Sequence, residues 1–332
     1  MTPQPRAAIV GISGPILTDE ERALFSAAPP TGLILFKRNI RDGAQLSDLV
    51  ASLRATVPGV LLMVDQEGGR VARLRPPCWR AHPAAGGIGD LFRRHPEAGL
   101  RAAFLTGALI GTDCNDAGFD VVCAPVLDLQ VPGADAVIGD RAYGADPANV
   151  AVLARAVAEG LLAAGIQPVG KHAPGHGRAT LDSHLALPEL EDVDEADLVP
   201  FRANAWLPWM MTAHIRYRRL DPHAPATLSR TVLDEVVRGR IGFANLLVSD
   251  DLAMHAVSGD PGMLAVASLA AGCDLALHCS GVLAETRSVL HAVPAPDAAA
   301  RTRLVAAAAM ARRRRVELDA AAMSIERDAL LA

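Results

Sequence analysis

The sequence predicts an α/β fold in which eight parallel strands alternate with helices and close into a single-domain (β/α)8 TIM barrel with extra C-terminal helices. Eight short apolar runs recur along the chain, and a segment with helix signals follows each of them. The length of 332 residues suits one barrel, which typically needs ~250 residues and often carries insertions. The first run ends in GISG without a GxGxxG, which disfavours a doubly wound sheet.

The expected strands are short runs rich in Val, Ile and Leu, and several of them are apolar throughout. That pattern is typical of strands buried on both faces, as in a parallel sheet. In chain order the runs are 7–12, 32–37, 60–65, 119–126, 166–172, 209–214, 245–250 and 274–279.

The expected helices begin at residues that commonly cap helix N-termini, because a short polar side chain can accept a bond from a free backbone N–H. The candidate caps are Thr18 (with Glu21 as its capping-box partner), Asp42, Asp146, Ser229 and Asp260. We expect residues 75–89 to form a long loop after the third strand. We expect residues from about 297 to 332 to pack on the barrel as helices, so that residues 1–332 form one domain.

Composition and charge narrow the class of protein. The net charge of −5 offers no general attraction for a polyanion, so nucleic acid is not an expected partner. Five cysteines, an odd number without a CxxC, indicate free thiols in a reducing compartment. The N-terminus has no signal-peptide pattern, and no run of 18 apolar residues occurs. We therefore expect a cytoplasmic monomer that does not bind membranes.

Polar side chains stand where six of the expected strands end, and in a barrel the C-terminal strand ends form the catalytic face. One Asp at such a position can simply cap the next helix, but six polar ends indicate a site. These residues are Asp65, Asp128, Lys171 with His172, His214, Asp250 with Asp251, and His278.

The stretch KHAPGHGRATLDSH, residues 171–184, concentrates three histidines in one glycine-broken segment. A zinc site is one alternative, with His214 and Asp250 completing the ligands of His172. The segment between His172 and His176 contains proline and glycine, however, and cannot form the helix of an H-E-x-x-H site. A serine hydrolase is disfavoured, because no G-x-S-x-G elbow occurs in the chain.

Glycoside hydrolysis fits these residue types better, since it needs one proton donor and one carboxylate at the anomeric carbon. In an extended loop Asp182 and His184 would project to the same side, so that the carboxylate could orient the imidazole. Asp250, at a strand end, would supply the other carboxylate. Pro174, Gly175 and Gly177 would let the loop bring His184 over the site.

The motifs KHAPGHG and DSH, with VSDDLAM following at 248–254, resemble glycoside hydrolase family 3, and in particular its single-domain bacterial β-N-acetylglucosaminidases. Other blocks resemble the family in the same order and together span about residues 30 to 280. They are GLILFKRN (32–39), VDQEGGRVARL (64–74), APVLDL (124–129), VIGDRAYG (137–144), MTAHIRY (211–217) and LDPHAPATLSR (220–230).

The resemblance implies a role for each matching residue. Asp250 would be the nucleophile of a retaining mechanism, His184 the general acid/base and Asp182 its partner. The residues implied to bind N-acetylglucosamine are Asp65, Arg73, Arg141, Lys171 and His172, with Met211 and His214 beside them. No metal or cofactor is then required. Ala173 and Arg178 depart from the family pattern, which commonly has a bulky apolar residue and an Asp at these positions.

The expected function is that of a β-N-acetylglucosaminidase acting on a small glycan substrate. It would remove terminal GlcNAc from muropeptides such as GlcNAc-1,6-anhydroMurNAc, with or without peptide, in peptidoglycan recycling. The alternatives are a phosphorylase of the same fold, in which a histidine acid/base would not repel phosphate, and a metal-dependent amidohydrolase. A barrel that binds sugar without catalysis would not need Asp182, His184 and Asp250.

Overall fold

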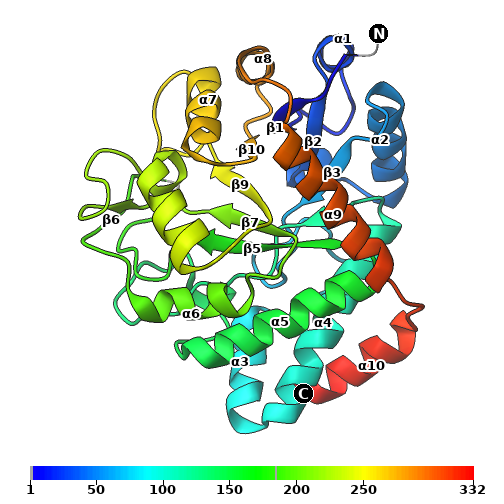
Figure 1. The fold of residues 1–332 in the computed structure, drawn as a ribbon. Helices are drawn as coiled ribbons and strands as arrows, with labels where there is room; N and C mark the ends of the chain where they lie inside the picture. Colours follow the sequence, from blue (N-terminus) through cyan, green and yellow to red (C-terminus); the bar gives the residue numbers. More distant parts are fainter. Residues whose placement is uncertain (1–2, 184) are drawn as a thin grey trace.

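The computed structural model describes residues 3–183 and 185–332. Its centre is a closed barrel of parallel strands, which confirms the predicted fold (Figure 1). Each of the eight predicted runs overlaps one barrel strand. Around the barrel the described strands follow the order β1 (Arg6–Gly11), β10 (Leu275–His278), β9 (Leu246–Asp251), β7 (Trp209–Thr212), β5 (Gln167–Ala173), β4 (Val121–Val122), β3 (Leu61–Val64) and β2 (Pro30–Leu35).

A helical segment follows every barrel strand, as predicted. These segments are α1 (Asp19–Ala27), α2 (Gly43–Thr56), α3 (Ala85–Arg94) with α4 (Pro96–Asp116), α5 (Pro147–Ala163), α6 (Glu195–Ala203), the π-helical η4 (Val232–Arg240), α7 (Pro261–Ala271) and α8 (Leu283–Ala292). Short 3-10 turns lie at η1 (Lys37–Asn39), η2 (Gly139–Arg141) and η3 (Ala226–Leu228), and β6 (Glu189–Leu190) pairs with β8 (Arg216–Tyr217) outside the barrel.

The predicted caps are confirmed by their hydrogen bonds. Thr18 and Glu21 form the reciprocal capping box of α1. Asp42, Asp146 and Asp260 each accept from the backbone N–H three residues on. The Ser229 hydroxyl accepts from the backbone N–H of Val232 at 3.3 Å, at the start of the helical segment after β8.

One boundary in the sequence interpretation was wrong. Residues 75–89 were expected to form a loop, but α3 begins at Ala85, so only the first part of that range is irregular. Glycines at 86, 87 and 89 lower helix propensity and hide this helix from a propensity argument. Gly89 is required by packing, because a Cβ there would lie 1.7 Å from the carbonyl oxygen of Tyr143.

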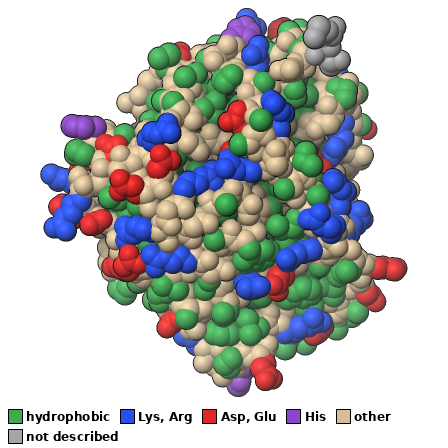
Figure 2. Space-filling view, in the orientation of Figure 1, with side chains coloured by type: hydrophobic (Ala, Val, Ile, Leu, Met, Phe, Trp, Pro, Cys, Tyr) green, Lys and Arg blue, Asp and Glu red, His purple; other side chains and the backbone are tan. Residues whose placement is uncertain are grey.

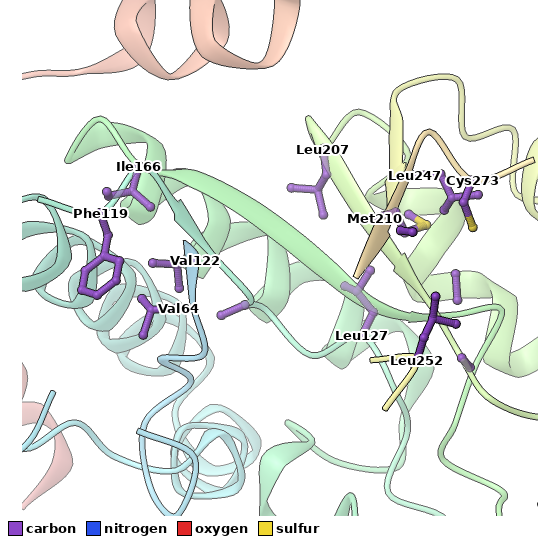
Figure 3. Packing of buried hydrophobic residues seen from close by; sticks show 14 of the residues in the cluster. Val64, Phe119, Val122, Leu127, Ile166, Leu207, Met210, Leu247, Leu252 and Cys273 are labelled. Carbon is purple, nitrogen blue, oxygen red and sulfur yellow. The ribbon is translucent and has the colours of Figure 1, made fainter. Parts of the chain in front are cut away.

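Apolar side chains fill two layers, one inside the barrel and one between the barrel and its helices. The inner cluster includes Ile9, Met63, Val169 and Trp209. Figure 3 shows part of the outer cluster, where Val122, Leu127, Leu207 and Leu247 are among the labelled side chains.

The predicted C-terminal helices are α9 (Ala298–Arg314) and α10 (Ala320–Leu331). Ala307 of α9 packs into the inner cluster. Arg303 of α9 bonds to Asp274 at 2.6 Å and to the carbonyl of Ala244 at 2.9 Å, just before β10 and β9 begin. Helix α9 therefore covers the N-terminal end of the barrel and leaves the C-terminal strand ends for a site.

The surface seen in Figure 2 carries basic and acidic side chains beside one another. The basic run Arg312–Arg315 is exposed at the end of α9. In the part of the chain that the structure describes, no helix combines the length and the apolar character needed to cross a membrane.

Candidate active site

A small cavity lies at the C-terminal strand ends, where the polar residues of the sequence converge. Its volume is about 160 Å³, below the ~300–1,000 Å³ of typical drug-sized ligand pockets, and so suits one sugar unit better than a chain of sugars. Seven of the predicted site residues line it: Asp65, Arg73, Arg141, Lys171, His172, Met211 and Asp250. Glu67, His176, Ser183, Asp251 and several apolar side chains complete the wall.

Two carboxylates and three cations form one side of the cavity. Lys171, at the end of β5, bonds to Asp65 at 2.9 Å and to Glu67 at 2.6 Å. Arg141 bonds to both oxygens of Glu67, at 2.8 and 2.9 Å, and Arg73 bonds to Asp65 at 3.1 Å. Arg70, three residues after Glu67, bonds to Asp140 and not to this network.

The charges in this network keep both carboxylates ionised. Burial alone would raise the pKa of Asp65, but Lys171 and Arg73 outweigh it and lower that pKa. Burial also opposes ionisation of Glu67, yet Lys171 and Arg141 lower its pKa to about 2. Asp65 and Glu67 in turn raise the pKa of Lys171, although burial alone would lower it. A carboxylate that is ionised and fixed in this way can accept bonds from sugar hydroxyls.

The loop after β3 places Arg73 through a buried glutamine. Gln66 accepts bonds from the backbone N–H groups of Arg73 and Leu74, at 2.7 and 3.0 Å, and donates to the carbonyl of Leu74. The Arg73 guanidinium lies 5.3 Å from the ring of Phe36, and its Nε is buried without a partner among the described residues. Arg73 thus keeps one donor for a ligand.

Asp128 organises the two histidines that follow β5. It is fully buried and accepts from His172 Nδ1 at 2.7 Å and from the backbone N–H of His176 at 2.7 Å. Burial works against ionisation of Asp128, but His172 and His176 lower its pKa. A carboxylate only accepts, so the His172 proton sits on Nδ1 and the ring is fixed against the cavity wall.

Asp250, the penultimate residue of β9, is a buried, ionised carboxylate. It is 8% exposed, and its Oδ1 accepts from the backbone N–H of Asp251 at 2.8 Å. Burial alone would raise its pKa, but His214 and His172 attract the charge and lower the pKa below the ordinary value. Its own backbone N–H bonds to the Thr212 hydroxyl at 3.1 Å, which ties β9 to β7 at this point. Such a group can act as a nucleophile.

His214 does not line the cavity, although the sequence interpretation placed it among the sugar contacts. It is fully buried behind Asp250. Its Nε2 bonds to the carbonyl of Asp251 at 2.9 Å and its Nδ1 to the Thr227 hydroxyl at 2.9 Å, so both ring nitrogens are occupied by protein. The geometry favours a positioning role for His214.

These bonds disfavour the zinc alternative, in which His172 and His214 would both be ligands. Both nitrogens of His214 bond to protein groups, and Nδ1 of His172 bonds to Asp128. Within residues 3–183 and 185–332 there is no group of three His, Cys, Asp or Glu side chains arranged to hold a metal ion.

The loop between β5 and β6 holds the remaining predicted residues. His184 lies outside the described residues. The Asp182 carbonyl accepts from the backbone N–H groups of Leu185 and Ala186, at 2.9 and 3.1 Å. Arg178 ties the loop to α6, because it bonds to Asp197 at 2.8 Å and to Asp194 at 3.0 Å.

Sequence reasoning placed Asp128 among the polar strand ends but gave it no role, and it gave Glu67 and Ser183 none. The partners of Asp128, His172 and His176, follow another strand, so its role could not be inferred from its own position. The partners of Glu67, Lys171 and Arg141, are likewise distant in sequence. Ser183 carries no signal of its own, because its contact with His176 depends on how the loop folds.

Known proteins are similar to this chain over most of its length. Residues 12–316 match the family model described as the glycosyl hydrolase family 3 N terminal domain. The chain is 44% identical over 279 residues to a β-hexosaminidase of Pseudomonas aeruginosa, with 82% of each chain covered. It is 40% identical over 322 residues to a β-hexosaminidase of Methylococcus capsulatus, with 94% of each covered.

A solved structure is similar over nearly the whole chain. The crystal structure of NagZ from Neisseria gonorrhoeae in complex with N-trifluoroacetyl-D-glucosamine has a TM-score of 0.87 and 32% identity, and the match covers 99% of both chains.

Proposed function

The chain belongs to glycosyl hydrolase family 3 and is a β-N-acetylhexosaminidase, and from that premise we propose that it is a retaining exo-β-N-acetylglucosaminidase with Asp250 as its nucleophile. The observation that carries this proposal is the buried, low-pKa Asp250 in a cavity that suits one sugar unit. The solved neighbour that holds N-trifluoroacetyl-D-glucosamine supports an N-acylated glucosamine as the bound group.

In this mechanism Asp250 attacks the anomeric carbon and forms a covalent glycosyl-enzyme, which water then opens with retention of configuration. We assign both proton transfers to His184, with Asp182 as the group that orients it. The imidazole protonates the leaving oxygen in the first step and takes a proton from water in the second.

The sugar would be held by Asp65, Arg73, Arg141, Lys171 and His172. Asp65 can accept from hydroxyl groups while Lys171 and Arg73 keep it ionised. Arg73 Nε can donate to the sugar, and the outer nitrogen of neutral His172, whose proton sits on Nδ1, can accept from it. Met211 contributes an apolar surface to the wall.

The proposed substrates are small muropeptides with a terminal GlcNAc, such as GlcNAc-1,6-anhydroMurNAc with or without peptide. The small cavity supports this choice, because it accommodates one terminal sugar and leaves the rest of the substrate at its mouth. The corresponding physiological role is peptidoglycan recycling in the cytoplasm.

The test is covalent labelling of Asp250. An activated 5-fluoro-glycosyl inhibitor should modify Asp250 in the wild type, as read by peptide mass spectrometry, and Asp250→Ala should lose turnover and labelling together. Modification of another carboxylate refutes the assignment. Product analysis on the wild type should give free GlcNAc with or without phosphate, whereas GlcNAc-1-phosphate as the main product would indicate the phosphorylase alternative.

A further inference from the structure

Ser183 and His176 form a buried pair that the proposed mechanism does not use. The Ser183 hydroxyl lies 2.9 Å from His176 Nε2, and the two residues are 2% and 3% exposed. Both line the cavity that contains Asp250. The sequence neighbours of Ser183 are Asp182 and His184, the residues to which we assign proton transfer.

The backbone of Ser183 also has a hydrogen-bond partner, in the segment that follows β9. Its carbonyl accepts from the backbone N–H of Ala256 at 3.2 Å. Ala256 belongs to the segment that leaves β9 after Asp250. Ser183 therefore joins the loop that carries the proton-transfer residues to the segment that follows the nucleophile.

His176 is a fixed support for this contact. Its backbone N–H donates to Asp128 at 2.7 Å, and Asp128 also holds the ring of His172. The next residue, Gly177, packs so closely on the neighbouring segment that a Cβ there would lie 2.1 Å from the carbonyl oxygen of Leu129. Asp128 therefore fixes the backbone of His176, to which Ser183 bonds, and it also orients the ring of His172, a proposed sugar-binding residue.

The His176 ring has no competing partner in the part of the chain that the structure describes. Its Nδ1 is buried and makes no hydrogen bond there, so Ser183 is the group that its ring bonds to. Burial and the neighbouring His172 lower the pKa of His176 to about 4, so the ring stays neutral near pH 7. A neutral, buried imidazole of this kind is suited to holding a hydroxyl and not to transferring the proton itself.

We propose that Ser183, bonded to His176, is a positioning residue for its chain neighbours Asp182 and His184, to which we assign protonation of the leaving group. This inference rests on the proposed function, and it adds a residue that acts on the proton-transfer step through its neighbours. Loss of the hydroxyl should loosen these neighbours and leave Asp250 and the sugar-binding residues in place.

The test is Ser183→Ala, assayed on a natural disaccharide and on an aryl GlcNAc with a good leaving group. The natural substrate needs protonation of its leaving oxygen and should lose about tenfold in kcat/KM, the scale of one hydrogen bond. The aryl substrate needs little protonation, and its kcat/KM, which reports the first step alone, should change less than about twofold because attack by Asp250 is unaffected. Losses are compared in kcat/KM, since kcat on the aryl substrate also reports the second step, in which His184 takes a proton from water.

Ser268→Ala is the matched control, because Ser268 is a fully buried serine in α7 whose hydroxyl bonds only to a helix carbonyl in the described residues. It should slow neither substrate. His176→Leu removes the other half of the pair and should show the same selectivity as Ser183→Ala, whereas His176→Gln, which can still bond to the hydroxyl, should recover part of the loss.

Equal losses on both substrates, or no loss on either, overturn the positioning role. A wild type that releases no GlcNAc from either substrate overturns the proposed function instead. The two failures are therefore distinguished by the wild-type measurement.

Discussion

Asp250 and Asp251 are neighbours in sequence, but their surroundings shift their pKa values in opposite directions. Burial alone would raise both. For Asp250 the nearby His214 and His172 reverse the effect and lower the pKa, whereas for Asp251 burial prevails and the pKa is raised. Asp251 instead accepts from the backbone N–H groups of Ala253 and Cys279, so it shapes the end of β9. The physical environment therefore favours Asp250 as the nucleophile.

At the residue scale, the role assigned to His184 predicts a dependence on the leaving group. His184→Ala should lower kcat on a natural disaccharide by roughly 10²- to 10⁴-fold, the usual contribution of general acid catalysis. An aryl GlcNAc whose leaving group has a low pKa should lose far less in the glycosylation step, because it departs without protonation. Steady-state rates on a series of aryl leaving groups measure this, and equal losses across the series would remove His184 from the role.

The sequence predicted which polar residues stand at the strand ends, and the barrel brings most of them to one cavity. Their pairing was not predictable, because partners such as Lys171 and Glu67, or His172 and Asp128, come from different strands. His214 shows the limit clearly: it follows a barrel strand like the others, but Thr227 and Asp251 take both of its nitrogens.

At the scale of elements, helix α10 is linked to the loop that carries Glu67. The buried Arg327 donates to His82 Nδ1 at 3.0 Å, and His82 Nε2 lies 3.0 Å from Asp113. Arginine only donates and a carboxylate only accepts, so His82 must be neutral with its proton on Nε2. The His82 carbonyl accepts from the backbone N–H of Gly69, two residues after Glu67.

This link predicts that Arg327→Met weakens both stability and sugar binding. Removing the donor leaves a buried acceptor unpaired, which should cost roughly 1–3 kcal/mol in the free energy of unfolding. KM should rise while kcat changes little, because the turn beside Glu67 loses its support. Thermal denaturation and steady-state kinetics measure the two effects.

Glu326→Gln serves as the control on the same helix, since Glu326 forms an exposed pair with Arg101 at 2.7 Å. It should change neither quantity, because exposed ion pairs contribute little. A similar loss of stability in both variants would contradict a specific contribution of the buried Arg327–His82 bond.

The elements themselves were largely predictable, because apolar runs and caps are local signals. The exception was α3, whose glycines serve contacts with distant segments such as Tyr143. The π-helical η4 and the small pair β6–β8 were not predicted either. The pair joins residues that are distant in sequence, such as Glu189 and Arg216, so it has no local signature.

At the scale of the whole molecule, buried neutral histidines predict a loss of stability in mild acid. The pKa of His176 is lowered to about 4, chiefly by burial, and burial also lowers the pKa of His82. An unfolded histidine titrates near ~6.5, so below that pH the unfolded chain binds more protons than the folded chain. The free energy of unfolding should therefore fall as pH drops from ~6.5 towards 4. Asp197, whose pKa burial raises to about 6, acts in the opposite direction and offsets part of this loss.

His176→Gln isolates one contribution to this pH dependence. A shift from ~6.5 to about 4 corresponds to roughly 3 kcal/mol of stability that is present at pH 7 and lost by pH 4. The variant cannot titrate, so its free energy of unfolding in urea should vary less between pH 7 and 4 than that of the wild type. His291→Gln replaces an exposed histidine of α8 and should leave the wild-type dependence intact. If the pH dependence of His176→Gln matches that of the wild type, the buried ring of His176 is not what limits stability in mild acid.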